Sequence, residues 1–162
     1  MPDMRIVPVP YDHPDAVKLD ELVQLEYVER YGESDASPMD PAHFEPPHGV
    51  YLLAYDEDEV PVATGGWRAK SATPEGLRDG DAEMKRMFVV REARGRGLAR
   101  AMIAALEDSA RAAGRLRMVL ETGGEQPEAI ALYQSSGYAP TDRFGLYRNE
   151  ADAQYFAKDL QE

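Results

Sequence analysis

A strand, a glycine-containing turn, a long amphipathic helix and a second strand follow one another in the middle of this chain. Residues 82–90 have the apolar and β-branched composition of a strand. Residues 97–113 carry apolar side chains at helical spacing, and Gly114 follows the last of them. Residues 117–121 again have the composition of a strand. This order predicts a right-handed β-α-β crossover whose helix covers a sheet that contains parallel strands.

Further strands and helices are expected on both sides of this unit. In chain order they are a strand over 5–9, a helix over 15–31, a loop over 32–49 with a helical turn near Pro41, a hairpin of strands over 50–55 and 60–67, a helix over 127–136, and final strands near Tyr138 and over 155–160. In the helix over 15–31, apolar residues from Val17 to Tyr27 predict a broad buried face. The pattern indicates a mixed α/β sheet, and 162 residues suit one domain spanning 1–162.

The turn before the central helix has the features of a phosphate-binding site. Gly95 and Gly97 have no side chains that would cover the backbone N–H groups. The start of a helix adds free N–H groups and a partial positive charge, and Arg94 and Arg96 add formal charge. A pyrophosphate would fit here. The alternative is an ordinary glycine turn with surface arginines, since both the G-x-G-x-x-G and the G-x-x-x-x-G-K-[ST] motifs are absent.

The overall charge limits the partners. The net charge of -12, from 18 basic and 30 acidic residues, disfavours binding to nucleic acid or to an anionic membrane and suits a cationic substrate. Residues 85–117 are nevertheless locally basic, which indicates an anionic ligand there.

The residue types present exclude several kinds of site. Without cysteine the chain has no disulfide, thiolate metal site or cysteine nucleophile, and the three histidines lack metal-ligand spacing, so no metal is expected. The N-terminus lacks the apolar region of a secretory signal, and no apolar stretch is long enough to cross a membrane. These features predict a cytoplasmic protein.

Two motifs resemble those of the GNAT superfamily of acyl-CoA N-acyltransferases. Residues 94–99, Arg-Gly-Arg-Gly-Leu-Ala, match its [QR]-x-x-G-x-[GA] element. Residues 126–138, which begin Gln-Pro-Glu-Ala and end Gly-Tyr, resemble its second signature, N-x-x-A-x-x-x-Y-x-x-x-G-[FY]. The chain departs from the family pattern at Arg91, where many relatives have proline, and at Gln126, where asparagine is common.

The resemblance implies a fold and a co-substrate. The fold is a mixed, mostly antiparallel twisted sheet of about six or seven strands with a splayed central pair, flanked by about four helices. The co-substrate is acetyl-CoA. The residues implied to bind it are Phe88, Val89, Arg94, Gly95, Arg96, Gly97, Leu98, Ala99 and Gln126, with the backbone N–H groups of Phe88 and Val89 directed at the acetyl carbonyl.

Acyl transfer to an amine needs a base and an acid. An amine with a pKa of about 10.4 costs about 4 to 5 kcal/mol to deprotonate at pH 7, and a carboxylate can assist. The resemblance indicates Glu83 as this base, and Glu121 and Glu33 are the second and third candidates. The alternative is that Glu83 is a solvated strand residue or an ion-pair partner of Lys85 or Arg86. By motif position, Tyr133 resembles the acid that protonates the departing thiolate, and the alternative is a core tyrosine.

The most consistent function is an N-acetyltransferase that transfers acetyl from acetyl-CoA to a primary amine by direct attack in a ternary complex. A non-catalytic acyl-CoA sensor of the same fold is the alternative, and an RNA-binding protein is disfavoured by the net charge. The acceptor would be a small-molecule or peptide amine. The acidic residues of the long loop, Glu33, Asp35, Asp40 and Glu45, offer attraction for a cationic acceptor. A homodimer is possible because relatives are often dimers.

Overall fold

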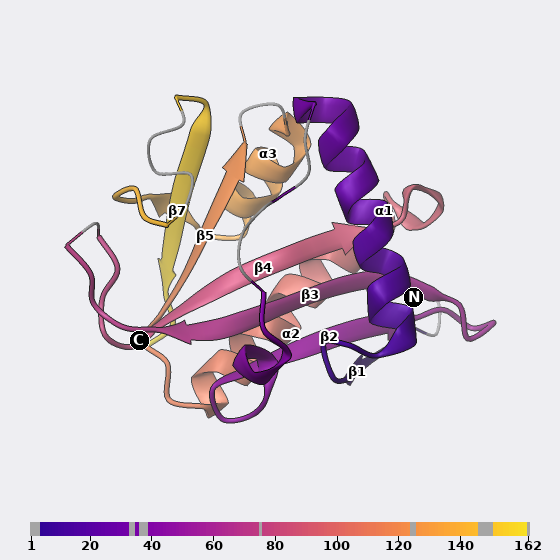
Figure 1. Cartoon of the computed structure of the whole chain (residues 1–162), viewed down its shortest axis with the longest axis horizontal. Coiled ribbons are helices and arrows are strands. Elements are labelled where there is room, and N and C mark those ends of the chain that lie inside the picture. The colour runs from indigo at the N-terminus through magenta and orange to yellow at the C-terminus, as the bar shows by residue number, and fades with distance from the viewer. Residues whose placement is uncertain are drawn as a thin grey trace.

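A single mixed sheet organises the chain in the computed structural model, which describes residues 4–32, 35, 39–74, 76–123, 126–145 and 151–161. Seven strands lie in the order β1-β2-β3-β4-β5-β7-β6 (Figure 1). Their bounds are β1 Arg5–Pro8, β2 Gly49–Tyr55, β3 Pro61–Lys70, β4 Asp81–Val89, β5 Arg117–Gly123, β6 Ala139–Pro140 and β7 Ala153–Asp159. Only β4 and β5 run parallel, so the predicted mixed, mostly antiparallel sheet is confirmed.

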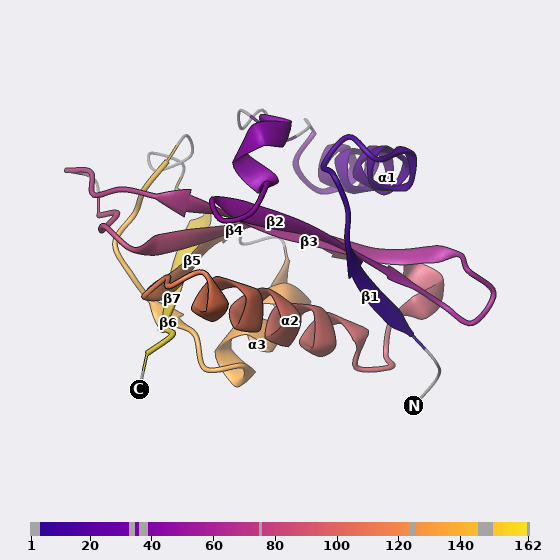
Figure 2. The same cartoon turned by 90° about the horizontal axis from the view of Figure 1, so that it is seen from below.

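Helices cover both faces of this sheet. Within the described residues there are three α-helices, α1 Pro14–Tyr31, α2 Leu98–Ala112 and α3 Pro127–Ser135, and two short 3₁₀ helices, η1 Pro41–Phe44 and η2 Arg91–Ala93. Seen from below, α1 and η1 lie over one face, while α2 and α3 lie against the other (Figure 2). The helical turn expected near Pro41 is η1. None of the described helices is long and apolar enough to cross a membrane.

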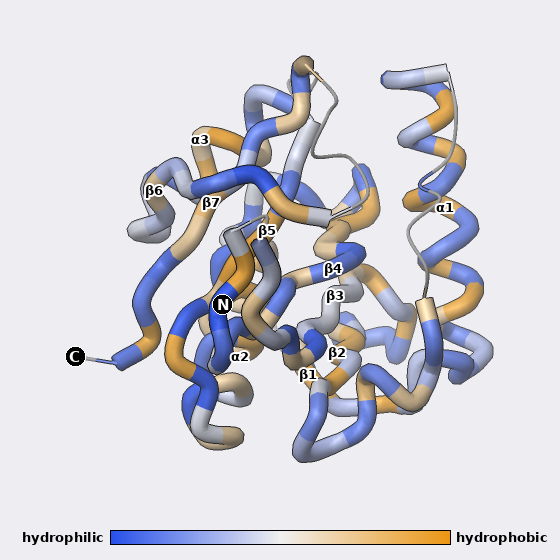
Figure 3. Tube along the Cα trace, turned by 60° about the vertical axis from the view of Figure 1, so that its left-hand side comes forward, coloured by the Kyte–Doolittle hydropathy of each residue, from blue (hydrophilic) through white to orange (hydrophobic). Residues whose placement is uncertain are grey.

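Helix α1 starts and stops where its sequence indicates. His13 caps the start, since its Nδ1 accepts a hydrogen bond from the Asp15 N–H at 3.0 Å. Gly32 ends the helix with a φ of 79°, and its N–H donates to the Val28 carbonyl. The broad buried face predicted for this helix is wrong in part. Only Ala16, Leu19 and Val23 are buried, whereas Val17, Leu22, Leu25 and Val28 are exposed. Figure 3 shows hydrophobic and hydrophilic residues alternating along α1.

The main core lies between the sheet and α2. The buried side chains of α2 include Leu98, Met102 and Leu106, which recur at helical spacing and face β3 and β4. Trp67 of β3 is 1% exposed, and its indole N–H donates to the Ser109 hydroxyl of α2 at 3.0 Å. This contact ties the C-terminal part of α2 to β3, the strand that borders β4.

Strands β4 and β5 pair over a short distance and then separate. Their register runs from Asp81↔Arg117 to Glu83↔Val119. Beyond this point the register between β3 and β4 shifts, and Arg86 has a φ of 59°, which is unusual for a residue other than glycine. The two strands diverge from there in Figure 1. The splayed pair that the resemblance implied is therefore present.

A buried ion pair fastens the closed end of this splayed pair. The Arg117 guanidinium donates to both carboxylate oxygens of Asp81 at 2.8 Å, and both side chains are buried. Arg117 also donates to the Gly76 carbonyl at 3.2 Å, which joins the preceding loop to the sheet. The pair therefore holds β4 against β5 immediately before they separate.

Removing one partner of this ion pair should destabilise the fold. We expect Asp81→Ala to lower the free energy of unfolding by about 3–5 kcal/mol, because the Arg117 charge stays buried without its partner. Urea denaturation measures the change. Glu59→Ala, which breaks the exposed ion pair with Arg5, is the matched control and should cost no more than about 1 kcal/mol. Equal losses in the two variants would contradict this role for Asp81.

Candidate active site

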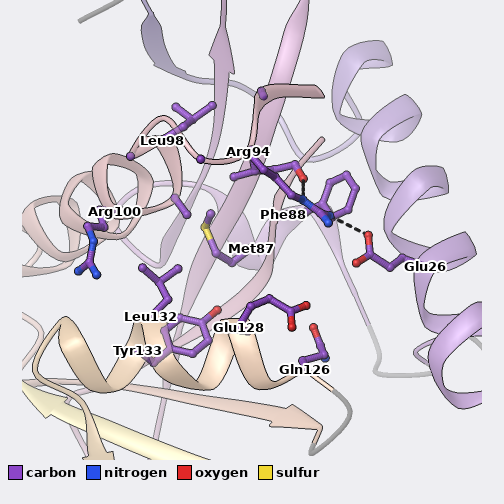
Figure 4. Close-up of a pocket in the computed structure, with 16 residues that line it drawn as sticks. Glu26, Met87, Phe88, Arg94, Leu98, Arg100, Gln126, Glu128, Leu132 and Tyr133 are labelled. Carbon is purple, nitrogen blue, oxygen red and sulfur yellow. Dashed lines mark hydrogen bonds and ion pairs between the residues drawn. The ribbon is translucent and has the colours of Figure 1, made fainter. Parts of the chain in front are cut away.

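A pocket with a volume of about 340 Å³ lies beside the C-terminal end of β4, beyond the point where β4 and β5 separate. It is bordered by the end of β4, the start of α2 and the inner face of α3 (Figure 4). The residues that line it are Glu26, Met87, Phe88, Val89, Ala93, Arg94, Gly95, Gly97, Leu98, Ala99, Arg100, Gln126, Glu128, Ala129, Leu132 and Tyr133. The structure thus brings together every residue expected to bind the co-substrate except Arg96.

The turn into α2 leaves backbone N–H groups available on the pocket side. Gly95 and Gly97 have φ values of 81° and 78°, a conformation that favours glycine, and no atom lies within 4 Å of where a Cβ would be. The first helical hydrogen bond runs from the Ala101 N–H to the Gly97 carbonyl, and no side chain caps this end. The N–H groups of Leu98 and Ala99 therefore have no acceptor within the helix, and this end can bind an anion.

The end of β4 turns one peptide group toward the pocket. The Val90 N–H donates to the Val62 carbonyl of β3 at 2.9 Å, and Phe88 lies opposite Thr64. In a strand, the N–H and C=O of one residue point to one side, and those of the next residue point to the other side. Since the Val90 N–H is bonded to β3, the N–H and C=O of Val89 face away from β3. The Val89 carbonyl accepts a hydrogen bond from Arg94 Nε at 2.9 Å, as this orientation requires. The backbone N–H groups of Phe88 and Val89 were both expected to face the acetyl carbonyl. That of Val89 points away from β3 and so has the suitable direction.

Glu26 of α1 holds Arg94 at this turn. Arg94 donates to the Glu26 carboxylate at 2.9 Å and stacks over the Phe88 ring at 5.5 Å. Arg30 contacts the same carboxylate at 3.1 Å and reaches Glu128 of α3 at 2.6 Å. These contacts place two carboxylates in the wall of the pocket that the sequence motifs gave no reason to expect. They also show that part of the locally basic segment is neutralised by α1.

Two other arginines differ in their relation to the pocket. Arg96 is exposed, and its guanidinium lies 3.5 Å from the Glu92 carbonyl outside the pocket lining. Arg100, one turn into α2, lines the pocket and donates to the Ser135 hydroxyl at 2.7 Å. Arg100 is thus a pocket cation that the motif comparison did not single out, although it belongs to the basic segment.

Helix α3 contributes Gln126 and Tyr133. The Gln126 side chain donates to the Tyr31 hydroxyl at 3.2 Å, which joins α3 to α1. Tyr133 is 8% exposed, with its ring edge against Tyr138 at 5.8 Å, and its hydroxyl points into the pocket (Figure 4). Burial, and secondarily the nearby Glu121 carboxylate, raise the pKa of Tyr133 above its ordinary value. The phenol therefore stays protonated at neutral pH and can donate a proton.

The candidate bases have different surroundings. Glu83 is buried, and its carboxylate accepts from Arg68 Nε at 2.9 Å and lies 3.6 Å from Lys70. Glu121 is half-buried, and burial raises its pKa to about 7, with a smaller opposing effect from Lys85. Glu33, the third candidate, lies outside the described residues. In the part of the chain that the structure describes, no group of three or more His, Asp or Glu side chains could hold a metal ion.

Comparison with known proteins identifies the family. The profile of the Acetyltransferase (GNAT) family matches residues 16–138, about three quarters of the chain, and includes β4, the glycine turn, α2 and α3. The chain belongs to the GNAT acetyltransferase family. The two motifs that resemble the family's signatures are those that form the pocket, since residues 94–99 make the turn into α2 and residues 126–138 include α3.

Individual GNAT proteins resemble the chain over different lengths. An IAA acetyltransferase of Azospirillum brasilense is 42% identical over 81 residues, which cover 50% of this chain and 53% of that protein, so the chain spans about half the length of this relative. A Klebsiella pneumoniae structure described as an acyl-CoA N-acyltransferase has a TM-score of 0.78 and 25% identity, covering 98% of this chain and 99% of the other. A Salmonella typhimurium protein solved with its cofactor acetyl-CoA shares the fold, with a TM-score of 0.72 and 19% identity over 98% of this chain and 95% of the other.

The raised pKa of Glu121 predicts a pH-dependent stability. A folded-state pKa of about 7, against an ordinary value of 4.5, means that the folded protein holds a proton that the unfolded chain loses first. Stability contributed by this group is therefore lost as the pH rises from about 4.5 through 7. Glu121→Gln cannot ionise at this position. As the pH rises from 4 to 8, we expect its free energy of unfolding to increase by about 2–3 kcal/mol relative to that of wild type. Urea denaturation at several pH values tests this, and a difference that is constant with pH would contradict it.

Proposed function

We propose that this GNAT protein transfers an acetyl group from acetyl-CoA to a primary amine by direct attack within a ternary complex. One observation carries the proposal: the N–H groups of the glycine turn, the Val89 peptide and the Tyr133 hydroxyl all face the same pocket. Each of these groups suits a different part of an acetyl thioester of coenzyme A.

The residues present fit coenzyme A along the pocket. The uncapped N–H groups at the start of α2 suit diphosphate oxygens, because they are free donors at the positive end of the helix dipole, and Gly95 and Gly97 have no side chains to cover them. Arg94 and Arg100 add positive charge at this end. Met87 and Leu132 give the inner part of the pocket apolar walls, which suit the pantetheine arm. Acetyl-CoA, when bound, would supply the activated acyl group as its thioester.

Three of the chain's own groups would then act on the reacting atoms. The Val89 N–H would donate to the acetyl oxygen as negative charge develops there. The Tyr133 hydroxyl, which its raised pKa keeps protonated at neutral pH, would donate its proton to the departing sulfur as the bond between carbon and sulfur breaks. A carboxylate carried by one of the two splayed strands, Glu83 on β4 or Glu121 on β5, would remove a proton from the amine.

The comparisons support this function at the level of chemistry. The A. brasilense relative is named as an acetyltransferase, and the Salmonella protein of the same fold was solved with acetyl-CoA. A sensor that binds acyl-CoA without reaction remains the second candidate from the same fold. The orientation of Tyr133 into the pocket favours the enzyme, because binding alone does not require a proton donor there.

The proposed acceptor is a small-molecule or peptide amine. The excess of acidic residues over the whole chain attracts a protonated amine from solution. Two acids of the loop after α1 have structural contacts that reduce their part in this attraction. Asp35 lies within 3.5 Å of Lys85 and 3.4 Å of Arg86, and Asp40 caps η1 by accepting from the Ala42 N–H at 3.0 Å.

A thiol-release assay with acetyl-CoA and a panel of primary amines tests the function. We expect amine-dependent release of free thiol, with mass spectrometry showing an acetylated acceptor. The panel should include polyamines, amino acids, aminoglycosides and peptides. Binding of coenzyme A without thiol release from any amine would favour the sensor.

Replacing Tyr133 should separate catalysis from binding. We expect Tyr133→Phe to lower kcat at least about tenfold while the dissociation constant for coenzyme A changes little, because the ring is retained and only the proton donor is lost. Steady-state kinetics and calorimetry provide the two values. Tyr138→Phe, which alters a neighbouring hydroxyl that donates to Glu107, is the matched control for a changed tyrosine in the same core. A wild-type kcat in Tyr133→Phe would exclude this tyrosine from proton transfer.

A further inference from the structure

We propose that Glu121, rather than Glu83, is the base that accepts the proton of the acceptor amine, and that Glu83 is a positioning residue that acts on Glu121 through its charge. This inference rests on the proposed function and names a residue within it. It follows from where the two carboxylates stand relative to the separation of β4 and β5, and from which of them already has partners.

Glu83 lies in the closed part of the splayed pair and is occupied. Its register partner on β5 is Val119, the last pair before the strands separate. The carboxylate accepts from Arg68 Nε at 2.9 Å, and both side chains of this pair are less than a tenth exposed. If Glu83 were protonated or moved away, the Arg68 guanidinium would stay buried without its closest charged partner, and the folded state would be destabilised. This position is therefore unsuitable for a base, which must gain and release a proton in each turnover.

Glu121 lies in the open part. It comes two residues after Val119, so strand alternation places it on the same face of the sheet as Val119 and Glu83. Its antiparallel partner is Tyr155 of β7, while β4 has already moved away on its other side. No hydrogen bond or ion pair reaches its carboxylate from the residues that the structure describes. A half-buried carboxylate that has no partner among these residues, on the strand that borders the gap, is free to accept a proton.

Titratable groups face Glu121 from several elements. The charged ones are Lys85 and Glu83 on β4, Asp35 after α1 and Asp152 before β7, and the neutral ones are the phenols of Tyr27 on α1 and Tyr133 on α3. Lys85 is the favourable charge, but it also lies 3.5 Å from Asp35, which offsets its effect. Burial and the carboxylates of Asp35 and Glu83 together raise the pKa of Glu121 to about 7, the range in which a base works best at neutral pH.

The proton balance of the reaction is complete with these groups. As the amine nitrogen forms its bond to the acetyl carbon, one N–H proton passes to the Glu121 carboxylate. The bond between that carbon and sulfur breaks, and the sulfur takes the Tyr133 proton. Transfer of the Glu121 proton to the tyrosinate through solvent restores both side chains. The net change is a neutral amine and a thioester converted to an amide and a thiol.

Paired amide variants distinguish the two carboxylates. With wild type and the best amine of the panel, kcat/KM should rise with pH through about 7, because the base must be ionised. We expect Glu121→Gln to lower kcat about a hundredfold or more and to remove this dependence. Glu83→Gln should instead keep kcat within about tenfold of wild type and move the dependence to lower pH, since one negative charge near Glu121 is lost.

Two further variants keep the test decisive if folding is affected. Glu121→Asp retains an ionisable group, so its kcat should fall while the pH dependence persists. Glu57→Gln, on the exposed turn after β2, is the matched control and should leave the whole profile unchanged. Binding of coenzyme A by each variant, measured by calorimetry, reports whether the fold and the co-substrate site are intact.

The opposite pattern would overturn the assignment. If Glu83→Gln abolished turnover while Glu121→Gln kept the wild-type pH profile, Glu83 would be the base. Wild-type protein that binds coenzyme A but releases no thiol with any amine would refute the proposed function itself, and it would do so before any variant was compared.

Discussion

The separation of β4 from β5 is the constraint on which the rest of the site depends. A sheet normally satisfies the peptide groups on both sides of an interior strand, and here β4 loses its partner on one side after Glu83. The Val89 peptide is consequently turned toward the pocket, where Arg94 satisfies its carbonyl. The buried pair of Asp81 and Arg117 holds the strands together at one end, so the opening is confined to the other. The glycine turn and the start of α2 then extend the same opening with further free N–H groups.

Electrostatic contacts join α1 to β4 and to the turn that follows it. The acids of α1 pair with arginines that follow or interrupt β4: Asp20 with Arg86, Glu26 with Arg94 and Glu29 with Arg91. The basic segment is therefore less available to an anion than its sequence suggests. A diphosphate arriving at the turn would compete with Glu26 for Arg94, whereas the backbone N–H groups carry no such competitor. In the proposed function, the uncapped amides would therefore contribute more to co-substrate binding than the arginines.

The local features of the fold followed from the sequence, and the contacts between distant residues did not. The turn at Gly95 and Gly97 and the ends of α1 and α2 depend on residues near one another in the chain, so residue type and spacing were sufficient. The partner of Glu83 was not predictable in this way. Neighbours at short spacing suggested Lys85 or Arg86, but the partner is Arg68 on an adjacent antiparallel strand, brought there by the sheet register. The acids contributed by α1 and α3 to the pocket wall depend on packing in the same manner.

Amide resonances measured during a titration with coenzyme A test the central claim most directly. If the opening beside β4 holds the co-substrate, the backbone amides of Val89, Gly95, Gly97, Leu98 and Ala99 should shift together and saturate at a single dissociation constant. Amides of β1 and β2, at the far end of the strand order, should remain unshifted. Saturable binding that leaves Val89 and the glycine turn unchanged, or no binding at all, would contradict the account.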